Sequence, residues 1–575
     1  MTPRVLKSVD RPRELHWFHA GAMLYGDWGT SKAYVLGIAF ALAGHASWFF
    51  LGIMSALTAL VGVCYMIICH IYPDGGGVYS SVKHRSQILA VIGAFLLVAD
   101  YVVTASLSAL DAFHYFNFPH PEKWAVFSIL LIGAINWLGP KKGGNIAAVI
   151  AVFASAAAAI LFVSTLPHLP SVQLTMPKGG LPENWSIFVG IVLALSGVEA
   201  VANMTGIMVQ PVEKTSRNAI LPVLLEVTVL TFLLGLAMNA VPGLTNHTED
   251  MLRALGDHYI GRWYGALISL IFGFLLLSAA NTAVASLVSM QFLMAKDREL
   301  PYAFTKLNNF GMPTIPLLVA TAVPILVLVF EHEVLHLAAL YAIGVVGAIT
   351  MNIGSCATNF KLPLKKIERG LLFVAAVILI FIEVTIIFQK HNAFIFVLSV
   401  LSTGLALRYM TRYFSPPPEI EIPDFNVLTV SEAKEISALY RSTSLVALRS
   451  VNKLLLKEAS LRCRALGENA VYIGYVEESP KMIEFSDAVE PSPESLKLLG
   501  EAQKEMEVLG IMGLPIWQFG ADPGHLIAKA ARELEVNTLM IGTTKRNALT
   551  NVLRGDMLQR LNHLLPKKCH LVIVG

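Results

Sequence analysis

Charged residues are scarce in this sequence, and its cysteines do not occur at the spacings of metal or redox sites. Only 14% of the 575 residues are Asp, Glu, Lys or Arg, whereas soluble domains carry roughly 25%. The five cysteines include no CxxC pair. A net charge of +3 provides no basic excess for a nucleic-acid partner. With 55% hydrophobic residues and a mean hydropathy of +0.62, the composition predicts a polytopic membrane protein that is not an enzyme.

Long apolar segments account for most of the chain before residue 414. About 20 apolar residues suffice to cross a bilayer. Twelve segments meet this requirement, and they predict an all-α membrane domain: 20–42, 48–71, 86–113, 122–139, 143–166, 184–209, 219–242, 264–294, 313–330, 334–356, 370–389 and 392–413.

Basic residues between these segments predict the orientation. Loops on the side of the N-terminal segment hold eighteen Lys and Arg residues, and the opposite loops hold five. Because cytoplasmic loops carry the excess of basic residues, both termini are expected in the cytoplasm. The protein is accordingly expected in the inner or plasma membrane, with the lipid bilayer as its surroundings.

Four regions follow from these changes in composition. Residues 1–19 form a cytoplasmic N-terminal segment, 20–413 the transmembrane domain, 414–440 a linker and 441–575 a cytoplasmic domain. The linker begins with the proline-rich sequence SPPPEIEIPD. In the last region, short apolar runs alternate with amphipathic stretches, which predicts a doubly wound α/β domain with parallel strands at 444–449, 470–478, 514–519, 538–543 and 570–574.

Acidic side chains occur inside the first, third and sixth apolar segments, among others. Such residues are costly in a bilayer and usually mark a functional site. Asp27 lies in the first segment and Glu199 in the sixth. The third segment carries a stripe on one helical face, with Tyr101 adjacent to it. The stripe consists of Asp100, Thr104, Ser108 and Asp111.

Glycines interrupt the first and sixth segments near these acids. Gly26 and Gly29 flank Asp27, and Ser196-Gly197 precedes Glu199. Interruptions at equivalent positions of two five-helix blocks are typical of transporters built from inverted repeats. The sequence therefore predicts a five-plus-five inverted repeat with broken first and sixth helices. A site rich in acids and hydroxyls at the breaks suits a small hard cation.

Several motifs carry a family resemblance over residues 20 to about 412. They are YGDWGTSKAYVL (25–36), YPDGGGVYS (72–80), ADYVVTASLS (99–108), LSGVEAV (195–201), AANTAVAS (279–286) and LYAIGV (340–345). The sequence resembles the KUP potassium uptake family, most closely its KimA branch, within the amino acid–polyamine–organocation (APC) superfamily and its LeuT-like fold. The resemblance implies potassium and protons as transported ions.

Residue roles follow from that resemblance by position. It places Asp27, Tyr34, Asp100, Tyr101, Thr104, Ser108 and Tyr341 along the ion route. Ser196 and Glu199 would belong to the broken sixth helix, with Glu199 as the first choice for proton coupling and Asp27 as the second.

The C-terminal region resembles the universal-stress-protein family, most clearly in IGTTKRNALTNVLRGDMLQRL. Its nucleotide motif is incomplete. Arg449 replaces the usual acid after the first strand, and Lys545 and Asp556 occupy positions of the phosphate loop. We expect no bound cofactor and no ATP affinity. A regulatory role with a nucleotide as regulator, and a homodimer, are the expectations for this domain.

Lys32 and Asp111 each leave alternatives open. Lys32 is five residues after Asp27, and so about 140° around a helix from it. It either extends into a vestibule, neutralises a nearby carboxylate, or acts as a tethered cation in transport. Asp111 is either a solvated vestibule residue or part of the route.

Inward potassium transport coupled to protons, a symport, is the function that the sequence favours. Two alternatives remain. One is a proton-coupled permease for amino acids or amines, which would share the fold. The other is a membrane sensor that transports nothing, against which the acids in three spans argue.

Overall fold

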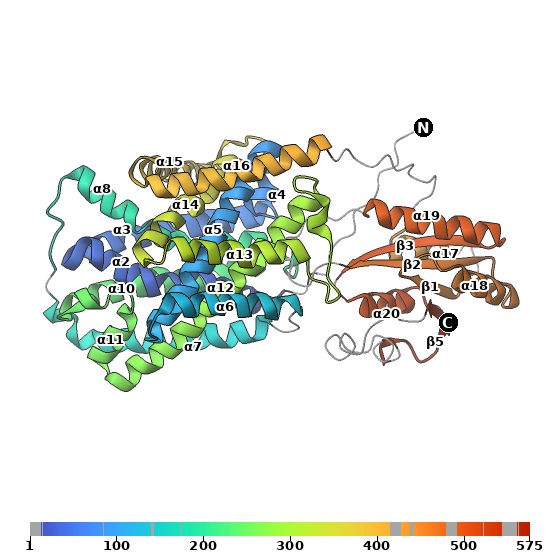
Figure 1. The fold of residues 1–575 in the computed structure, drawn as a ribbon, viewed down its shortest axis with the longest axis horizontal. Helices are drawn as coiled ribbons and strands as arrows, with labels where there is room; N and C mark the ends of the chain where they lie inside the picture. The colour runs from blue at the N-terminus through green and yellow to red at the C-terminus, as the bar shows by residue number, and fades with distance from the viewer. Residues whose placement is uncertain are drawn as a thin grey trace.

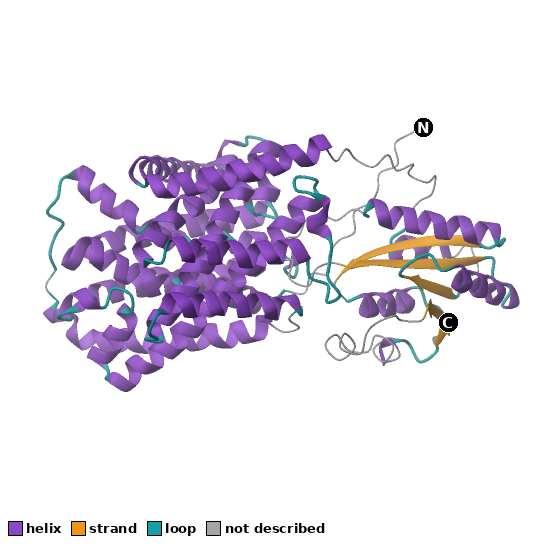
Figure 2. Ribbon diagram, in the orientation of Figure 1, coloured by secondary structure: helices purple, strands orange, loops and turns teal. Residues whose placement is uncertain are grey.

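The computed structural model describes residues 13, 15–83, 85–139, 143–172, 174–414, 427–437, 442–478, 491–520, 522–542, 561 and 563–574. Within these residues a helical bundle is followed by an α/β domain (Figures 1 and 2). The helices of the bundle are α1 (Trp17–Trp28), α2 (Ser31–Ala43), α3 (Ser47–Ile71), α4 (Val78–Lys83), α5 (Gln87–Tyr115), α6 (Pro121–Trp137), α7 (Gly143–Thr165), α8 (Leu181–Gly190), α9 (Ala200–Asn203), α10 (Val212–Ala237), α11 (Met251–Tyr259), α12 (Arg262–Lys296), α13 (Thr314–Phe330), α14 (Val334–Thr358), α15 (Lys366–Gln389) and α16 (His391–Phe414).

Each of the twelve apolar segments is largely helical, but not all form long single spans. Eight helical stretches in the described residues are long and apolar enough to cross a membrane, or nine if one bent pair counts as a span. The first two segments belong to one such stretch, Trp17–Ile71. Helices α6 and α13 have only 17 residues each. The protein is therefore a multi-pass membrane protein, and twelve spans and the inverted repeat stay predictions.

The sixth segment is strongly broken. Helix α8 ends at Gly190, and a 3₁₀ turn, Val192–Leu195, leads into the extended residue Ser196 (φ −60°, ψ 144°) and then Gly197 (φ 90°). Helix α9 begins three residues later, at Ala200. Helix α8 and the stretch Val192–Ile207 meet at 45°, so this bend lies at Ile191. The extended Ser196 and the positive φ of Gly197, which favours glycine, form a second interruption a few residues later.

The interruption of the first segment is milder than the prediction of a broken helix implies. Helix α1 ends at Trp28 and α2 begins at Ser31, yet the backbone N–H of Gly29 still donates to the carbonyl of Tyr25 at 2.9 Å. The hydroxyls of Thr30 and Ser31 donate to the carbonyls of Asp27 and Trp28, respectively. These hydroxyls satisfy the carbonyls that the interruption frees, so the helix changes direction little.

The C-terminal domain contains one parallel sheet of five strands, as predicted. The strand order is β3-β2-β1-β4-β5. The strands are β1 (Ser444–Leu448), β2 (Ala470–Glu478), β3 (Met512–Gly520), β4 (Thr538–Gly542) and β5 (His570–Val574), and the helices are α17 (Val430–Ser437), α18 (Lys453–Ala465), α19 (Pro493–Val508) and α20 (Pro523–Glu533). Helices α18 and α19 contribute to the core on one face of the sheet, and α17 and α20 to the core on the other.

Part of the predicted linker belongs to this sheet domain. Leu428 pairs with Ile516 at the edge of β3, and α17 follows directly. The predicted nucleotide-loop positions Thr543, Lys545 and Asp556 lie outside the described residues. Arg449 directly follows β1 and is exposed.

A buried acid joins the C-terminal end of α12 to the last helix of the bundle, α16. Glu299 is fully buried just after α12, and it accepts hydrogen bonds from two arginines of α16. Arg408 contributes its Nε and Arg412 its Nη2, the latter at 2.6 Å. Two positive partners compensate the desolvation of this carboxylate, so α16 is held firmly against the end of α12.

The C-terminal domain contacts the same end of α12 through an ion pair. Lys296 Nζ lies 2.8 Å from Glu477 Oε1 and 4.3 Å from the ring centroid of Phe519. The second oxygen of Glu477 accepts hydrogen bonds from Ser495 Oγ at 2.6 Å and from Trp517 Nε1 at 3.2 Å. Burial alone would raise the pKa of Glu477, but Lys296 and the serine hydrogen bonds outweigh it and hold this pKa below its ordinary value.

We expect Glu477→Gln to loosen this interdomain contact, because the neutral amide loses the charge attraction of Lys296. Hydrogen–deuterium exchange should rise in residues 292–300 and 514–520 of the full chain. Because the pKa of Glu477 is lowered in the folded protein, the ion pair with Lys296 stabilises the interdomain contact fully at neutral pH. Acidification through the pKa of Glu477 protonates this carboxylate, and it should loosen the contact in the wild type as the substitution does. Glu505→Gln is the matched control, because the Glu505–Lys453 pair lies within the C-terminal domain. Equal exchange in both variants would show that the ion pair does not hold the domains together.

Candidate functional site

The two interruptions cross each other at van der Waals distance. A Cβ atom on Gly197 would lie only 2.6 Å from the backbone N of Trp28 and 3.0 Å from the carbonyl carbon of Asp27. Any side chain at this position would therefore push the two segments apart. The crossing brings Asp27 and Glu199 to the same depth of the bundle although they are far apart in the sequence.

Helix α5 places the third acid beside this crossing. Helix α14 packs against it so closely that a Cβ on Gly344 would lie 2.9 Å from the backbone N of Asp100. Tyr341 precedes Gly344 by one turn and lies within electrostatic reach of all three acids. Thr104 donates its hydroxyl to the Asp100 carbonyl at 2.9 Å and lies 3.4 Å from Asp100 Oδ1.

The three acids are buried and unneutralised. Asp27, Asp100 and Glu199 are at most 5% exposed. Within the described ranges none of them forms an ion pair with a basic side chain, and the carboxyls of Asp100 and Glu199 interact with each other, that of Glu199 also with the backbone at Gly197. Three carboxylates in a low-dielectric site cannot all stay ionised without compensation, because each loses its hydration and repels the others. This arrangement is suited to taking up protons, cations or both.

The acids do not form a single metal cage. Among the residues that the structure describes, no three His, Cys, Asp or Glu side chains are placed to hold one metal ion. Asp27, Asp100 and Glu199 nevertheless interact electrostatically with one another. The three acids are therefore electrostatic neighbours without being the joint ligands of one metal ion.

The other predicted site residues have different surroundings. Tyr34 is buried on α2 and lies within electrostatic reach of Asp27, Asp100 and Asp111. Ser108 and Ser196 are buried as well. Tyr101 accepts a hydrogen bond from Asn203 Nδ2 at 3.0 Å, which connects α5 to α9. The structure thus places Tyr34 close to the acids and gives Tyr101 a helix-to-helix contact.

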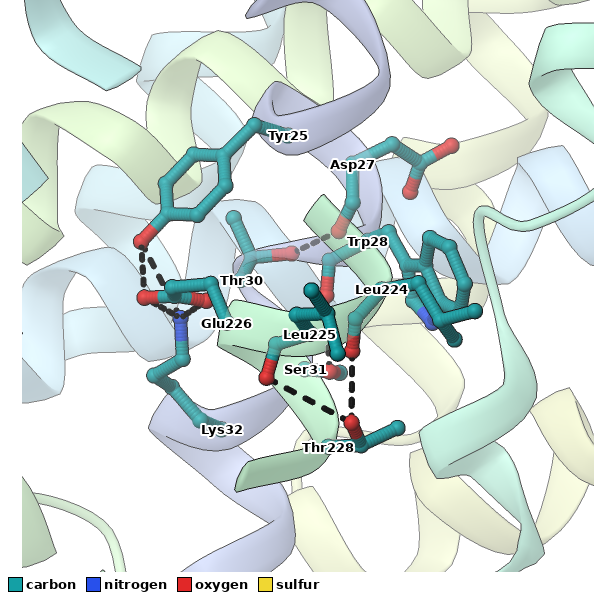
Figure 3. A network of polar contacts seen from close by, with 10 residues as sticks. All are labelled: Tyr25, Asp27, Trp28, Thr30, Ser31, Lys32, Leu224, Leu225, Glu226 and Thr228. Atoms are coloured by element: carbon teal, nitrogen blue, oxygen red, sulfur yellow. Dashed lines mark hydrogen bonds and ion pairs between the residues drawn. The ribbon is translucent and has the colours of Figure 1, made fainter. Parts of the chain in front are cut away.

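Lys32 has a carboxylate partner that the sequence analysis missed. Its Nζ lies 2.8 Å from both oxygens of Glu226 on α10, and it donates to the hydroxyl of Tyr25 at 3.0 Å (Figure 3). Tyr25 in turn donates to Glu226 Oε1 at 2.9 Å. Lys32 is fully buried, so its ammonium ends at Glu226 and not in an aqueous vestibule. The structure favours the interpretation that Lys32 neutralises a nearby carboxylate.

One signal in the sequence could have identified Glu226. It stands alone in the apolar stretch LPVLLEVTVL, and Lys32 is the one Lys or Arg inside the first segment. Buried charges in a bilayer usually occur as pairs. A lone Lys in one span and a lone Glu in another therefore predict that the two side chains are in contact.

A bundle of membrane-spanning helices with a broken segment, a crossing of two interruptions and buried unneutralised acids defines a membrane transport protein. Residues 15–412 match the family model described as amino acid permease. This match covers more than half of the chain, and the chain therefore belongs to the amino acid permease family. Membership in a transporter family supports the expectation that the protein is not an enzyme.

One curated relative is similar over part of its length. The chain is 26% identical over 381 residues to the potassium transporter KimA of Bacillus subtilis (strain 168). The similarity covers 59% of this chain and 61% of that relative, which is less than two thirds of its length.

We expect Lys32→Met to destabilise the protein by about 3–5 kcal/mol, because Glu226 would stay buried without a positive partner. Glu226→Gln should also destabilise it, since Lys32 then loses its counter-charge. The double variant should recover most of the loss. Thermal unfolding of the purified full-length protein in detergent measures this cycle. Additive effects of the two substitutions would contradict a direct pair.

Proposed function

We propose that this protein carries potassium inward across the cell membrane and couples that movement to protons. One observation carries the proposal: three buried acids meet at the crossing of the two interruptions, and none has a basic partner among the described residues. Lys32, the basic residue nearest in sequence to Asp27, is already occupied by Glu226. The uncompensated negative charge at the crossing favours a cation as the transported species.

Potassium is the cation that the comparisons favour. The similar relative from Bacillus subtilis is named a potassium transporter. The site also offers the hydroxyl of Thr104 close to Asp100 and the unpartnered hydroxyl of Tyr341 within the described residues. Neutral oxygens beside single carboxylates suit a large monovalent ion, whereas a divalent ion takes several carboxylates at short distance.

Proton coupling would supply the energy for uptake at low external potassium. One elementary charge that crosses about 100 mV gains about 2.3 kcal/mol. A proton that enters with the potassium ion doubles the electrical contribution and adds that of the pH gradient. Inward movement, a symport, is the direction in which both ions gain this energy.

Glu199 is the proposed proton carrier. It follows Gly197 at the break of the sixth segment, and its carboxyl is buried beside Asp100 without a basic partner in the described part of the chain. Desolvation disfavours the charged form of such a carboxyl, and a nearby potassium ion favours it. Arrival of the cation would thus release the proton. Asp27 is the alternative carrier, because it lies on the other side of the same crossing.

A second candidate substrate is an organic amine. The family model that matches residues 15–412 is described as amino acid permease. The three buried acids would bind an ammonium group as readily as a metal cation, whereas Asp27 at the interruption would repel a substrate carboxylate. Competition between rubidium and amines for uptake distinguishes the two substrates.

The C-terminal domain is proposed to be a universal-stress-protein-like regulatory module in the cytoplasm that also supports a homodimer. The positive-inside pattern supports its location. The Lys296–Glu477 and Glu299–Arg412 contacts support regulation, because both reach the end of α12, which packs along α5 and its acid. A nucleotide other than ATP is the proposed class of regulator.

If Asp100 binds the ion, Asp100→Asn should abolish rubidium uptake, because the amide keeps the shape but removes the charge. The assay is uptake of radioactive rubidium by cells that lack their own potassium importers. Glu122→Gln, a change in an acid at the start of α6, should leave uptake intact. Wild-type uptake by the Asp100 variant, at equal amounts in the membrane, would remove Asp100 from the site.

Glu199→Gln should uncouple uptake from protons, since the amide fixes the neutral form. In proteoliposomes with equal potassium on both sides, exchange of labelled ion should survive. Uphill accumulation driven by an inward acid gradient should fail. If the acid gradient increases accumulation in the Glu199→Gln variant as much as in the wild type, another residue carries the proton. The same accumulation is then measured for Asp27→Asn.

A further inference from the structure

A fourth buried acid lies farther along the face of α5 that carries Asp100. Asp111 follows Ser108 by three residues on that face. It is fully buried rather than solvated, and neither of its oxygens has a hydrogen-bond partner among the described residues. An uncompensated carboxyl at this depth is costly unless it takes up a proton or a cation.

The loop between α10 and α11 covers Asp111. The carbonyl of Thr248 is so close to α2 that a Cβ on Gly37 would lie 1.7 Å from it. His114 Nδ1, one turn beyond Asp111, lies 2.8 Å from Glu249 Oε2 and ties α5 to the same loop. Tyr115 donates its hydroxyl to the carbonyl of Ala33 at 2.8 Å and ties α5 to α2. This end of the bundle is the one distant from the C-terminal domain (Figure 1).

The charged groups that face Asp111 are mostly acidic. His114, Glu249 and Asp250 interact with its carboxyl electrostatically, as do Tyr34 and Tyr115. The positive groups here are engaged with other acids: His114 with Glu249, and His247 and Arg253 with Asp250. His114, which is engaged with Glu249, partly offsets the charge of Asp111, while Glu249 and Asp250 add negative potential to it.

We propose that Asp111 is an outer binding site for a monovalent alkali cation, which holds the ion between the far end of the bundle and the inner acids. The proposal rests on the proposed function. Tyr34 is within electrostatic reach of Asp111 as well as of Asp27 and Asp100, and so adjoins both sites. A divalent ion is disfavoured, because no three acid, His or Cys side chains of the described residues are placed to hold a metal ion.

The test is the concentration dependence of rubidium uptake into proteoliposomes that contain the full chain. Asp111→Asn should raise the half-saturating rubidium concentration by roughly tenfold, because a negative site on the approach concentrates the cation. The maximal rate should stay within about twofold, since saturating ion fills the inner site without it. Asp111→Glu keeps the charge and should stay close to wild type. Asp111→Ser, a smaller neutral substitution, should repeat the effect of Asn if the amide impairs folding.

A surface acid at the same end provides the matched control. Asp257 on α11 is partly exposed and pairs with Arg253 at 3.9 Å. Asp257→Asn should leave the half-saturating concentration unchanged. Two results would overturn the proposal. One is an unchanged half-saturating rubidium concentration in the neutral Asp111 variants. The other is an uptake rate whose pH dependence changes while its dependence on rubidium concentration does not, which would make Asp111 a proton carrier. Failure of the proposed function is a separate result, namely a wild type that takes up no rubidium.

Discussion

The close approach of Gly197 to the backbone of Asp27 and Trp28 is the contact on which the site depends. Two segments can cross at this distance only where one of them carries no side chain. The positive φ of Gly197 also turns the chain so that Glu199 follows directly at the crossing. The acids are therefore positioned by backbone geometry, which side-chain rotation does not disturb.

The ion pair between Lys32 and Glu226 determines what this negative charge can do. If Lys32 reached Asp27, the site would be partly neutral and would attract a cation less strongly. Glu226 neutralises the ammonium of Lys32 and accepts hydrogen bonds from it with both oxygens. Lys32 therefore does not neutralise the acids at the crossing. The pair is neutral as a unit, which also makes its burial in the bundle tolerable. The ion pair of Lys32 with α10 is thus separate from the acids that the proposed function uses.

Periodicity and composition were sufficient to predict most of this architecture. The strands predicted at 470–478 and 570–574 coincide with β2 and β5, because both are short apolar runs next to amphipathic stretches, although β5 is only partly buried. The acids at 27, 100 and 199 were identified because charge is rare in apolar segments. The mild interruption at Gly29 was not predictable, since the hydroxyls of Thr30 and Ser31 that satisfy the freed carbonyls act only in the folded geometry. Glu226 was missed for a related reason, because its partner lies in a distant segment.

The junction at the end of α12 has a thermodynamic consequence for the whole molecule. Lys296 and Glu299, three residues apart, attach the C-terminal domain and α16 to a helix that packs along α5. If a ligand of the C-terminal domain changes the affinity of the acids on α5 for an ion, linkage requires the ion to change the affinity of that ligand by the same factor. The C-terminal domain would then respond to ion occupancy as well as control it, because the amount of ligand that this domain retains would report how far the acids of the helical bundle are loaded with ion.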